Sequence, residues 1–357
     1  MRIAQVAPLW ERVPPPGYGG IELVVAHLTD ELVRRGHEVT LFASGDSETQ
    51  AKLISAVPRA IRLDPSVKEP GIYEYLQLAS VGDLADQFDL IHFHTGLSAL
   101  PIAHLLKTPA MHTLHGRFSA DNAKVFDRYR SQSYISISLS QREGGPELNY
   151  ASNVYNGIDA GAYPFCAQPQ GEPYLAFLGR LSPEKGPHHA IELARKTGWK
   201  LKMAGKVDVV DRAFFEEAIA PQLDGDQIVY LGELDHDQKA ALLGGAVATL
   251  FPITWREPFG LVMIESMATG TPVIAMNLGA VPEVIVHGQT GFVCESLAEM
   301  EAAIAQVSSL QRQACRDHVL NRFSVACMVD GYEAAYGQVL GETAVSVPAR
   351  RSPRRVA

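Results

Sequence analysis

The chain has 357 residues, of which 46% are hydrophobic and 20% charged, a composition typical of a globular protein. At roughly 100–200 residues per domain this length predicts two domains. The 30 glycines and 22 prolines are too few for a collagen-like or low-complexity chain. The formal net charge of −9 excludes a general nucleic-acid-binding protein, which needs a broad basic face.

The first half of the chain alternates between strand and helix patterns. A short apolar run over residues 2–8 is followed by a Pro/Gly loop and by a helical pattern from 21 to 35, which a glycine ends. Further strands are predicted at 38–44, 89–94 and 110–114. Strands separated by helices favour parallel βαβ units in a doubly wound sheet.

The second half repeats this organisation after a segment rich in Gly, Pro and Gln, which predicts a linker over residues 163–173. Strands are then predicted at 174–179, 201–204, 228–231, 247–251 and 272–276. The pattern is helical from about 297 and ends in a helix within 323–341. The chain is therefore predicted to be α/β, with doubly wound parallel-sheet domains over 1–162 and 174–322. Ligands are expected in the cleft at the carboxyl ends of their strands.

Residues 257–265, with the sequence EPFGLVMIE, carry the strongest local signal, because they follow a predicted strand and open a helix. Gly260 at the first turn would leave backbone N–H groups open to an anion. Glu265 lies in a helix that is apolar almost all round, so this carboxylate needs partners. A ribose diol would satisfy both of its oxygens, while an internal arginine or a backbone N–H is the alternative. For Glu257 the alternative is an ordinary loop acid.

A second signal is GRLSPEKG at residues 179–186, just after the first strand of the second domain. Arg180 and Lys185 lie five positions apart on a glycine-bounded loop and can clamp a diphosphate, although a solvated turn is the alternative. The loop before the first helix lacks G-x-G-x-x-G, so the dehydrogenase fingerprint is absent. Gly19 and Gly20 can still place backbone amides against a phosphate, and a flexible turn is the alternative.

Histidines concentrate in one short window of the first domain. His92 and His94 share one face of a strand, so zinc has to be considered, but there is no H-E-x-x-H motif and no carboxylate at ligand spacing on a helix. We predict no metal site. His94 and His115 instead close two strands at the cleft, where we expect them to hydrogen-bond a substrate. The D-x-D triplets at 224–226 and 235–237 are interpreted as solvated turns.

Together these motifs, with GYGGIE at 17–22, LHG at 114–116 and YNGID at 155–159, resemble the GT-B glycosyltransferases. The most similar group is the retaining family four, also called glycosyl transferases group 1, and the resemblance covers residues 1 to about 340. It implies two facing Rossmann-like domains, with the acceptor on the first and the nucleotide-sugar donor on the second. It also implies that the last helix crosses back to the first domain.

The resemblance implies the reaction as well. A hexose-type sugar would move from a nucleotide-diphosphate sugar, with UDP favoured, to a sugar, lipid-linked or small-molecule acceptor, with retention through front-face attack. The acceptor is expected around residues 9–20 and 116–150. An epimerase or hydrolase on the same fold, or a non-catalytic nucleotide-sugar-binding protein, is the alternative.

Site residues follow from the resemblance position by position. Arg180 and Lys185 match the pair that binds the diphosphate, and Glu265 matches the carboxylate on the ribose. Glu257 matches the acid near the donor sugar, and His115 the histidine that touches this sugar. The remaining matches are Gly19 and Gly20 near the β-phosphate, Leu234 in the segment that meets the base, and Phe259, Gly260 and Leu261, whose amides contact sugar and phosphate.

No cofactor is expected, because fixed cations and helix-end amides stabilise the leaving diphosphate without a metal. Four widely spaced cysteines without a C-x-x-C pair indicate a reducing compartment, and no signal peptide or 18-residue apolar span is visible. We therefore expect a cytoplasmic protein. The tail over 342–357 has one acid and four arginines (Arg350, Arg351, Arg354 and Arg355) and is predicted to be disordered. Weak contact with anionic lipid at the inner membrane face is the alternative to a solvated tail.

Overall fold

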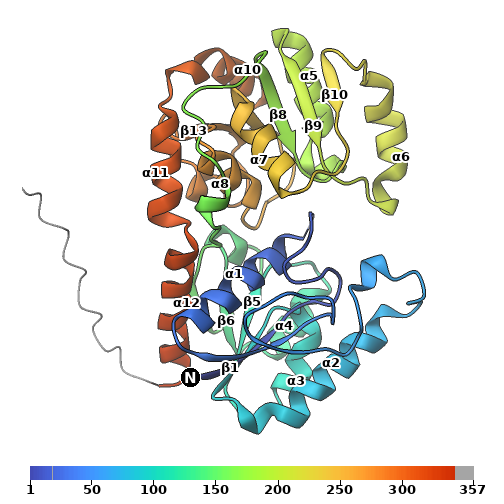
Figure 1. The fold of residues 1–357 in the computed structure, drawn as a ribbon, viewed down its shortest axis with the longest axis vertical. Coiled ribbons are helices and arrows are strands. Elements are labelled where there is room, and N and C mark those ends of the chain that lie inside the picture. The colour runs from blue at the N-terminus through green and yellow to red at the C-terminus, as the bar shows by residue number, and fades with distance from the viewer. Residues whose placement is uncertain (18, 342–357) are drawn as a thin grey trace, which may run out of the picture.

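The computed structural model describes residues 1–17 and 19–341. Two α/β lobes are stacked along the long axis of the molecule (Figure 1). The N-terminal lobe has a seven-stranded sheet in the order β3-β2-β1-β4-β5-β6-β7, and the C-terminal lobe a six-stranded sheet in the order β10-β9-β8-β11-β12-β13. Every pairing in both sheets is parallel. The predicted fold class is therefore confirmed.

The N-terminal sheet has β4 at its centre, with β1 and β5 on either side. Its strands are β1 (Arg2–Val6), β2 (Glu38–Phe42), β3 (Lys52–Ile54), β4 (Leu90–Phe93), β5 (Ala110–Leu114), β6 (Ser133–Ser136) and β7 (Tyr150–Asn153). The helices of this lobe are α1 (Gly20–Arg34), α2 (Pro70–Leu84), α3 (Leu100–Ala103) and α4 (Asn122–Arg128).

The C-terminal sheet is built in the same way around β8 and β11. Its strands are β8 (Tyr174–Leu178), β9 (Lys200–Ala204), β10 (Ile228–Tyr230), β11 (Ala248–Phe251), β12 (Val273–Met276) and β13 (Gly291–Cys294). The helices that follow in the chain are α5 (Pro187–Thr197), α6 (Arg212–Phe214), α7 (His236–Gly245), α8 (Leu261–Ala268), α9 (Val281–Val284), α10 (Leu297–Gln306), α11 (Arg312–Arg322) and α12 (Val325–Val339).

Four strands were not predicted from the sequence, namely β3, β6, β7 and β13. Three of them lie at sheet edges, where a strand needs only half-buried side chains. The fourth, β6, is buried but carries serines, and Ser136 Oγ donates to Asn153 Oδ1 at 2.8 Å. Short strands with polar residues lack the apolar run or the alternation that identifies a strand in a sequence.

Helix α12 crosses from the second lobe back onto the first (Figure 1). Its buried side chains, including Met328, Tyr332 and Tyr336, pack in one cluster with Ile3 of β1 and Leu28 of α1. The crossover that the resemblance implied is therefore present. The predicted basic tail over 342–357 lies outside the described residues.

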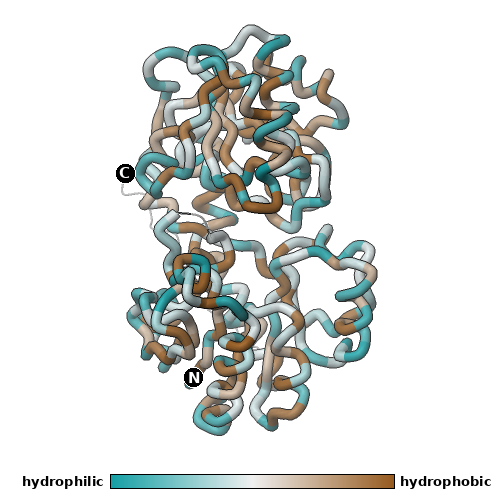
Figure 2. Tube along the Cα trace, turned by 90° about the vertical axis from the view of Figure 1, so that its right-hand side faces the viewer, coloured by the Kyte–Doolittle hydropathy of each residue, from teal (hydrophilic) through white to brown (hydrophobic). Residues whose placement is uncertain are grey.

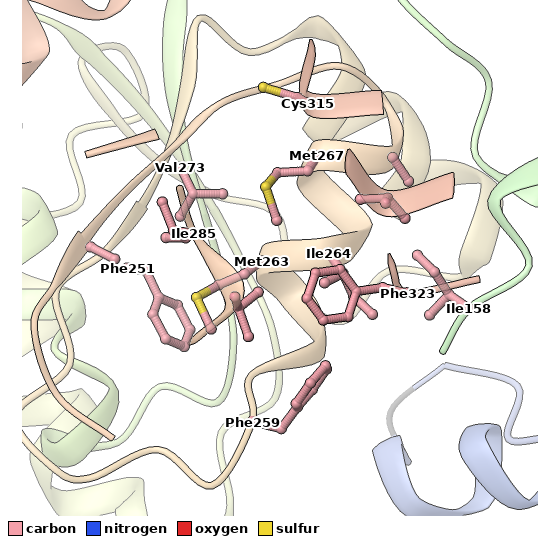
Figure 3. Packing of buried hydrophobic residues seen from close by; sticks show 14 of the residues in the cluster. Ile158, Phe251, Phe259, Met263, Ile264, Met267, Val273, Ile285, Cys315 and Phe323 are labelled. Atoms are coloured by element: carbon pink, nitrogen blue, oxygen red, sulfur yellow. The ribbon is translucent and has the colours of Figure 1, made fainter. Parts of the chain in front are cut away.

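Helix α8 is buried, as its apolar sequence predicts. Figure 3 shows Met263, Ile264 and Met267 of this helix packed among side chains from other elements, such as Phe251 and Phe323. Since a buried helix cannot shift without disturbing these contacts, its first turn is held in a fixed place.

The four cysteines are all free. Hydrophobic and hydrophilic residues are interspersed along both lobes (Figure 2). Within residues 1–17 and 19–341, no helix has both the length and the apolar character needed to span a bilayer.

Candidate active site

A cavity of about 360 Å³ lies between the two lobes. The segments that line it follow β1, β5, β6, β7, β8, β9, β10 and β11 in the chain, so it lies where the carboxyl ends of both sheets meet. It is lined by all the site residues that the resemblance implies: Gly19, Gly20, His115, Arg180, Lys185, Leu234, Glu257, Phe259, Gly260, Leu261 and Glu265. The structure thus brings these residues together, and their individual roles stay predictions.

Two helices begin at this cavity, α1 from the first lobe and α8 from the second. Gly260 precedes α8 with φ +84°, and a Cβ there would lie 2.8 Å from Met263 Cε, so the position requires glycine. A Cβ on Gly20 would lie 3.1 Å from Leu261 Cδ1, which shows how closely the two helix starts approach each other. The first backbone N–H groups of a helix lack intrahelical partners, so the two starts can together face one anion.

The loop at 179–186 is held firmly against the end of β11. Gly186 has φ +73°, and a Cβ there would lie 1.9 Å from Pro252 O. Arg180 forms an ion pair with Glu184, and its Nε lies 3.5 Å from Asp211 Oδ2. The guanidinium is thus oriented by protein carboxylates, a partnership that the sequence did not reveal.

Glu257 is buried and is held by two donors on a single oxygen. Lys185 forms an ion pair with Oε2, and Trp255 Nε1 donates to the same oxygen at 3.0 Å. The Lys185 ammonium also lies 4.8 Å from the centre of the Trp255 ring. The interpretation of Glu257 as an ordinary loop acid is therefore wrong, because its carboxylate is fixed at the cavity wall.

Glu265 is 3% exposed, and among the described residues it bonds neither an arginine nor a backbone N–H. Its Oε1 accepts from Lys239 Nζ at 2.7 Å and from the Tyr163 hydroxyl at 2.9 Å. Burial and the neighbouring carboxylate raise the pKa of Tyr163, so this hydroxyl keeps its proton and donates.

The loop that carries Glu257 also contacts the first lobe. Pro258 O accepts from Ser138 Oγ at 2.7 Å. Gly279 packs against the backbone of Glu257 in this loop. Four positions later, Glu283 accepts hydrogen bonds from the backbone N–H groups of Leu139 and Ser140 at 2.8 and 2.7 Å. These bonds fix the position of the loop relative to both lobes.

Sequence reasoning missed several cavity residues, notably Lys206, Lys239 and Trp255. Lys206 follows Gly205 at the carboxyl end of β9 and lies 3.1 Å from Asp208 Oδ2. A cation directly after a strand and a glycine is the same signal that identified Arg180, so Lys206 could have been predicted from the sequence. No local pattern marks Lys239 or Trp255.

His115 lines the cavity as predicted, but His94 does not. His94 is 2% exposed, and its two ring nitrogens bond His115 Nε2 at 2.9 Å and Gln5 Oε1 at 3.0 Å. The expectation that His94 bonds a substrate is therefore wrong.

The histidine pair and the two D-x-D triplets, which by sequence are candidate metal ligands, bond to other protein groups. Both nitrogens of His92 are hydrogen-bonded, to Tyr336 and Thr113. Asp224 accepts from two backbone N–H groups of its own turn, and Asp235 caps helix α7. Within residues 1–17 and 19–341 there is no group of three or more side chains suited to hold a metal ion.

A second, smaller cavity of about 160 Å³ adjoins the first at Glu257 and Pro258. Its other lining residues come from both lobes and are Arg117, Phe118, Ser140, Gln141, Glu143 and Arg256. The part from the first lobe falls within residues 116–150, where the acceptor is expected.

Comparisons with known proteins agree with this geometry. The family model Glycosyltransferase Family 4 matches residues 18–160, and Glycosyl transferases group 1 matches residues 166–320. The sequence is similar to glycogen synthase from Mycobacterium tuberculosis, with 30% identity over 361 residues and 86% of each chain covered. The fold is similar to that of sucrose-phosphate synthase from Thermosynechococcus elongatus, with a TM-score of 0.79, 19% identity, and 96% of this chain and 100% of that chain covered. It is also similar to Anabaena HepE in complex with UDP and glucose, with a TM-score of 0.72, 18% identity, and 95% and 100% covered.

Proposed function

Because the chain belongs to the family-four glycosyltransferases with the GT-B fold, we propose that it transfers a hexose from a nucleotide-diphosphate sugar to an acceptor hydroxyl, with retention and without a metal. One observation carries this proposal. The cations Arg180 and Lys185, the fixed carboxylates of Glu257 and Glu265, a histidine and two helix starts line a single cavity. This set matches the needs of a sugar nucleotide, which has a diphosphate, a ribose and a hexose.

The chemistry assigns a role to each group. Cleavage of the sugar–phosphate bond puts negative charge on the diphosphate, and Arg180, Lys185 and the backbone amides at the start of α8 stabilise it. Glu265 binds the ribose hydroxyls. Glu257 lies beside the hexose, whose ring gains positive charge as the bond breaks, and His115 bonds a hexose hydroxyl. The acceptor oxygen attacks from the face that the diphosphate leaves, which retains the configuration.

For the base we propose uracil. The solved structure of HepE with UDP, a protein of the same fold, supports this choice. Adenine and guanine are the competing outcomes. The base would lie by the segment 231–234, where a Cβ on Gly17 of the first lobe would come within 3.4 Å of Leu234 O.

The acceptor would enter through the second cavity, which shares Glu257 with the first. A sugar, a lipid-linked sugar or a small molecule with a free hydroxyl fits this proposal. The four free thiols suit a reducing compartment, so we place the reaction in the cytoplasm.

A thermal-shift screen of UDP, ADP, GDP and their hexose conjugates tests donor binding. A ligand at one hundred times its dissociation constant adds about 2.7 kcal/mol to the free energy of unfolding. Release of nucleoside diphosphate from the stabilising conjugate is then measured with and without cell extract as a source of acceptors. Extract-dependent release, with a product whose anomeric proton coupling matches that of the donor, supports the proposal.

Other outcomes contradict it. Release that does not depend on an acceptor indicates a hydrolase, and conversion of the donor into an isomeric sugar nucleotide indicates an epimerase. Stabilisation without any turnover indicates a binding protein.

A further inference from the structure

A line of buried polar side chains connects helix α12 with His115 at the cavity. Tyr336 of α12 accepts a hydrogen bond from Gln5 Nε2 at 2.9 Å, and Gln5 Oε1 lies 3.0 Å from His94 Nε2. His94 Nδ1 lies 2.9 Å from His115 Nε2. Gln5 and Tyr336 are 0% exposed and His94 is 2% exposed. Such a buried line of bonds has few ways to arrange its protons.

The positions of the protons follow from the chemistry of each group. The Gln5 amide oxygen can only accept, so His94 Nε2 carries a proton and donates it. A neutral His94 then has its lone pair on Nδ1, which makes His115 Nε2 the donor in the bond between the two rings. The remaining nitrogen, His115 Nδ1, has no hydrogen bond to another described residue.

We propose that Gln5 and His94 are positioning residues that hold His115 in its Nε2–H tautomer, with the Nδ1 lone pair available to the donor sugar. The identity of the ligand, a donor sugar, rests on the proposed function. It predicts that His115 accepts a hydrogen bond from a hydroxyl of the transferred hexose, and that it does not act as a proton donor.

Both rings are neutral at neutral pH, as the tautomer argument requires. Burial holds the pKa of His94 well below its ordinary value and lowers the pKa of His115 to about 4. No carboxylate bonds either ring among the described residues, so nothing opposes the effect of burial.

At the far end of the line, the proton of the Tyr336 hydroxyl decides which way the Gln5 amide points. Tyr336 OH also lies 2.9 Å from His92 Nδ1, and His92 Nε2 lies 2.7 Å from Thr113 Oγ1. When the tyrosine gives its single proton to His92, it can only accept from Gln5. In that arrangement the amide nitrogen of Gln5 bonds Tyr336 and its oxygen bonds His94, as the structure has them.

Nitrogen-15 NMR of histidine-labelled protein tests the proposal directly, because the two imidazole tautomers give distinct nitrogen shifts. The His115→Gln variant identifies the His115 signals by their loss. We expect the full-length parent protein to carry the His115 proton on Nε2 at neutral pH. A proton on Nδ1 overturns the proposal, whether or not the protein proves to be a transferase.

Gln5→Met removes both amide contacts at nearly constant volume. We expect a mixture of His115 tautomers in this variant and a donor KM raised about three- to tenfold, the effect of one hydrogen bond. His94→Phe, which removes the acceptor of the His115 proton, should have the same effects. An unchanged His115 tautomer in both variants overturns the proposal.

The matched control is Gln77→Met. Gln77 is also a buried glutamine, 2% exposed, and its Nε2 donates to Ala7 O at 3.1 Å, outside the line to His115. We expect it to lower the melting temperature without changing the His115 signals or the donor KM. Equal changes in both glutamine variants indicate general loosening and overturn the specific role of Gln5. If the parent shows the Nε2–H tautomer but no transfer, the proposed function fails while the tautomer assignment stands.

Discussion

Lys239 and Glu265 form a buried ion pair at the wall of the cavity, with Nζ 2.7 Å from Oε1. The Tyr163 hydroxyl bonds the same oxygen, and Oε2 has no hydrogen bond to another described residue. The lysine offsets the cost of burying the carboxylate. Glu265 is therefore oriented before a donor arrives, with one oxygen left to accept from a ribose hydroxyl.

Glu265→Gln should weaken donor binding and leave turnover nearly unchanged. The ribose lies far from the bond that breaks, so its contacts are equally strong in the ground and transition states. Loss of a hydrogen bond to a charged group should raise the donor KM about tenfold or more. Steady-state kinetics measure both constants, and melting curves separate this effect from destabilisation by the unpaired Lys239. An unchanged donor KM in the folded variant would contradict the ribose role.

Glu257→Gln should show the opposite pattern. Its carboxylate faces a sugar ring that gains positive charge only as the bond breaks, so we expect kcat to fall about 100-fold. Donor affinity should hold, because Lys185 loses its ion-pair partner and can turn fully to the diphosphate. Donor affinity is measured by calorimetry alongside kcat. The distinction between the two glutamates fails if both folded variants show the same changes.

The sequence was sufficient to locate most of the site because the ends of parallel strands meet at one edge of a sheet. Gly19, Arg180 and Glu257 each follow a predicted strand, so the fold class alone brings them near one cleft. What could not be predicted is how they are paired. Lys239 and Tyr163 lie 26 and 102 positions from Glu265, and no local pattern links residues so far apart.

His94 shows a second limit of sequence reasoning. Strand alternation correctly places His92 and His94 on one face, but it does not reveal what covers that face. Helix α12, more than two hundred positions later, covers it, and its Tyr336 bonds His92 directly. A residue at a strand end is therefore open to ligand only where no distant element packs over it.

We predict that activity survives chelation. In the proposed reaction Arg180, Lys185 and helix-end amides meet the diphosphate charge, and the described residues contain no group of three metal-ligating side chains. Product formation in excess EDTA should stay within about twofold of the untreated rate, well under 1 kcal/mol in barrier height. Complete loss of activity that Mg²⁺ or Mn²⁺ restores would contradict the metal-independent mechanism.

Four histidines of the first lobe should lower its stability in acid, while buried Glu22, whose pKa burial raises to about 7, acts in the opposite direction. Burial holds the pKa of His92 and His94 well below the ordinary value and lowers the pKa of His112 and His115 to about 4. In the unfolded chain these groups titrate near pH 6.5. Between about pH 6.5 and 4 these histidines thus bind more protons in the unfolded state than in the folded state. The contribution of these histidines to the free energy of unfolding is fully present above pH 6.5 and is lost as the pH falls toward 4.

The effect of a single histidine on the pH dependence of stability can be measured at His112, which is not part of the hydrogen-bonded line from Tyr336 to His115. His112 stacks on Phe93 with ring centres 5.2 Å apart, and His112→Leu removes its proton uptake. The free energy of unfolding, measured by urea titration at pH 7.5, 6.0 and 5.0, should fall less steeply in this variant, by up to about 1.4 kcal/mol per pH unit. Met111→Leu, a change at the neighbouring buried position of β5, should lower stability equally at each pH. If His112→Leu and the parent lose stability at the same rate, His112 takes up no extra proton on unfolding and its pKa is not depressed in the folded protein.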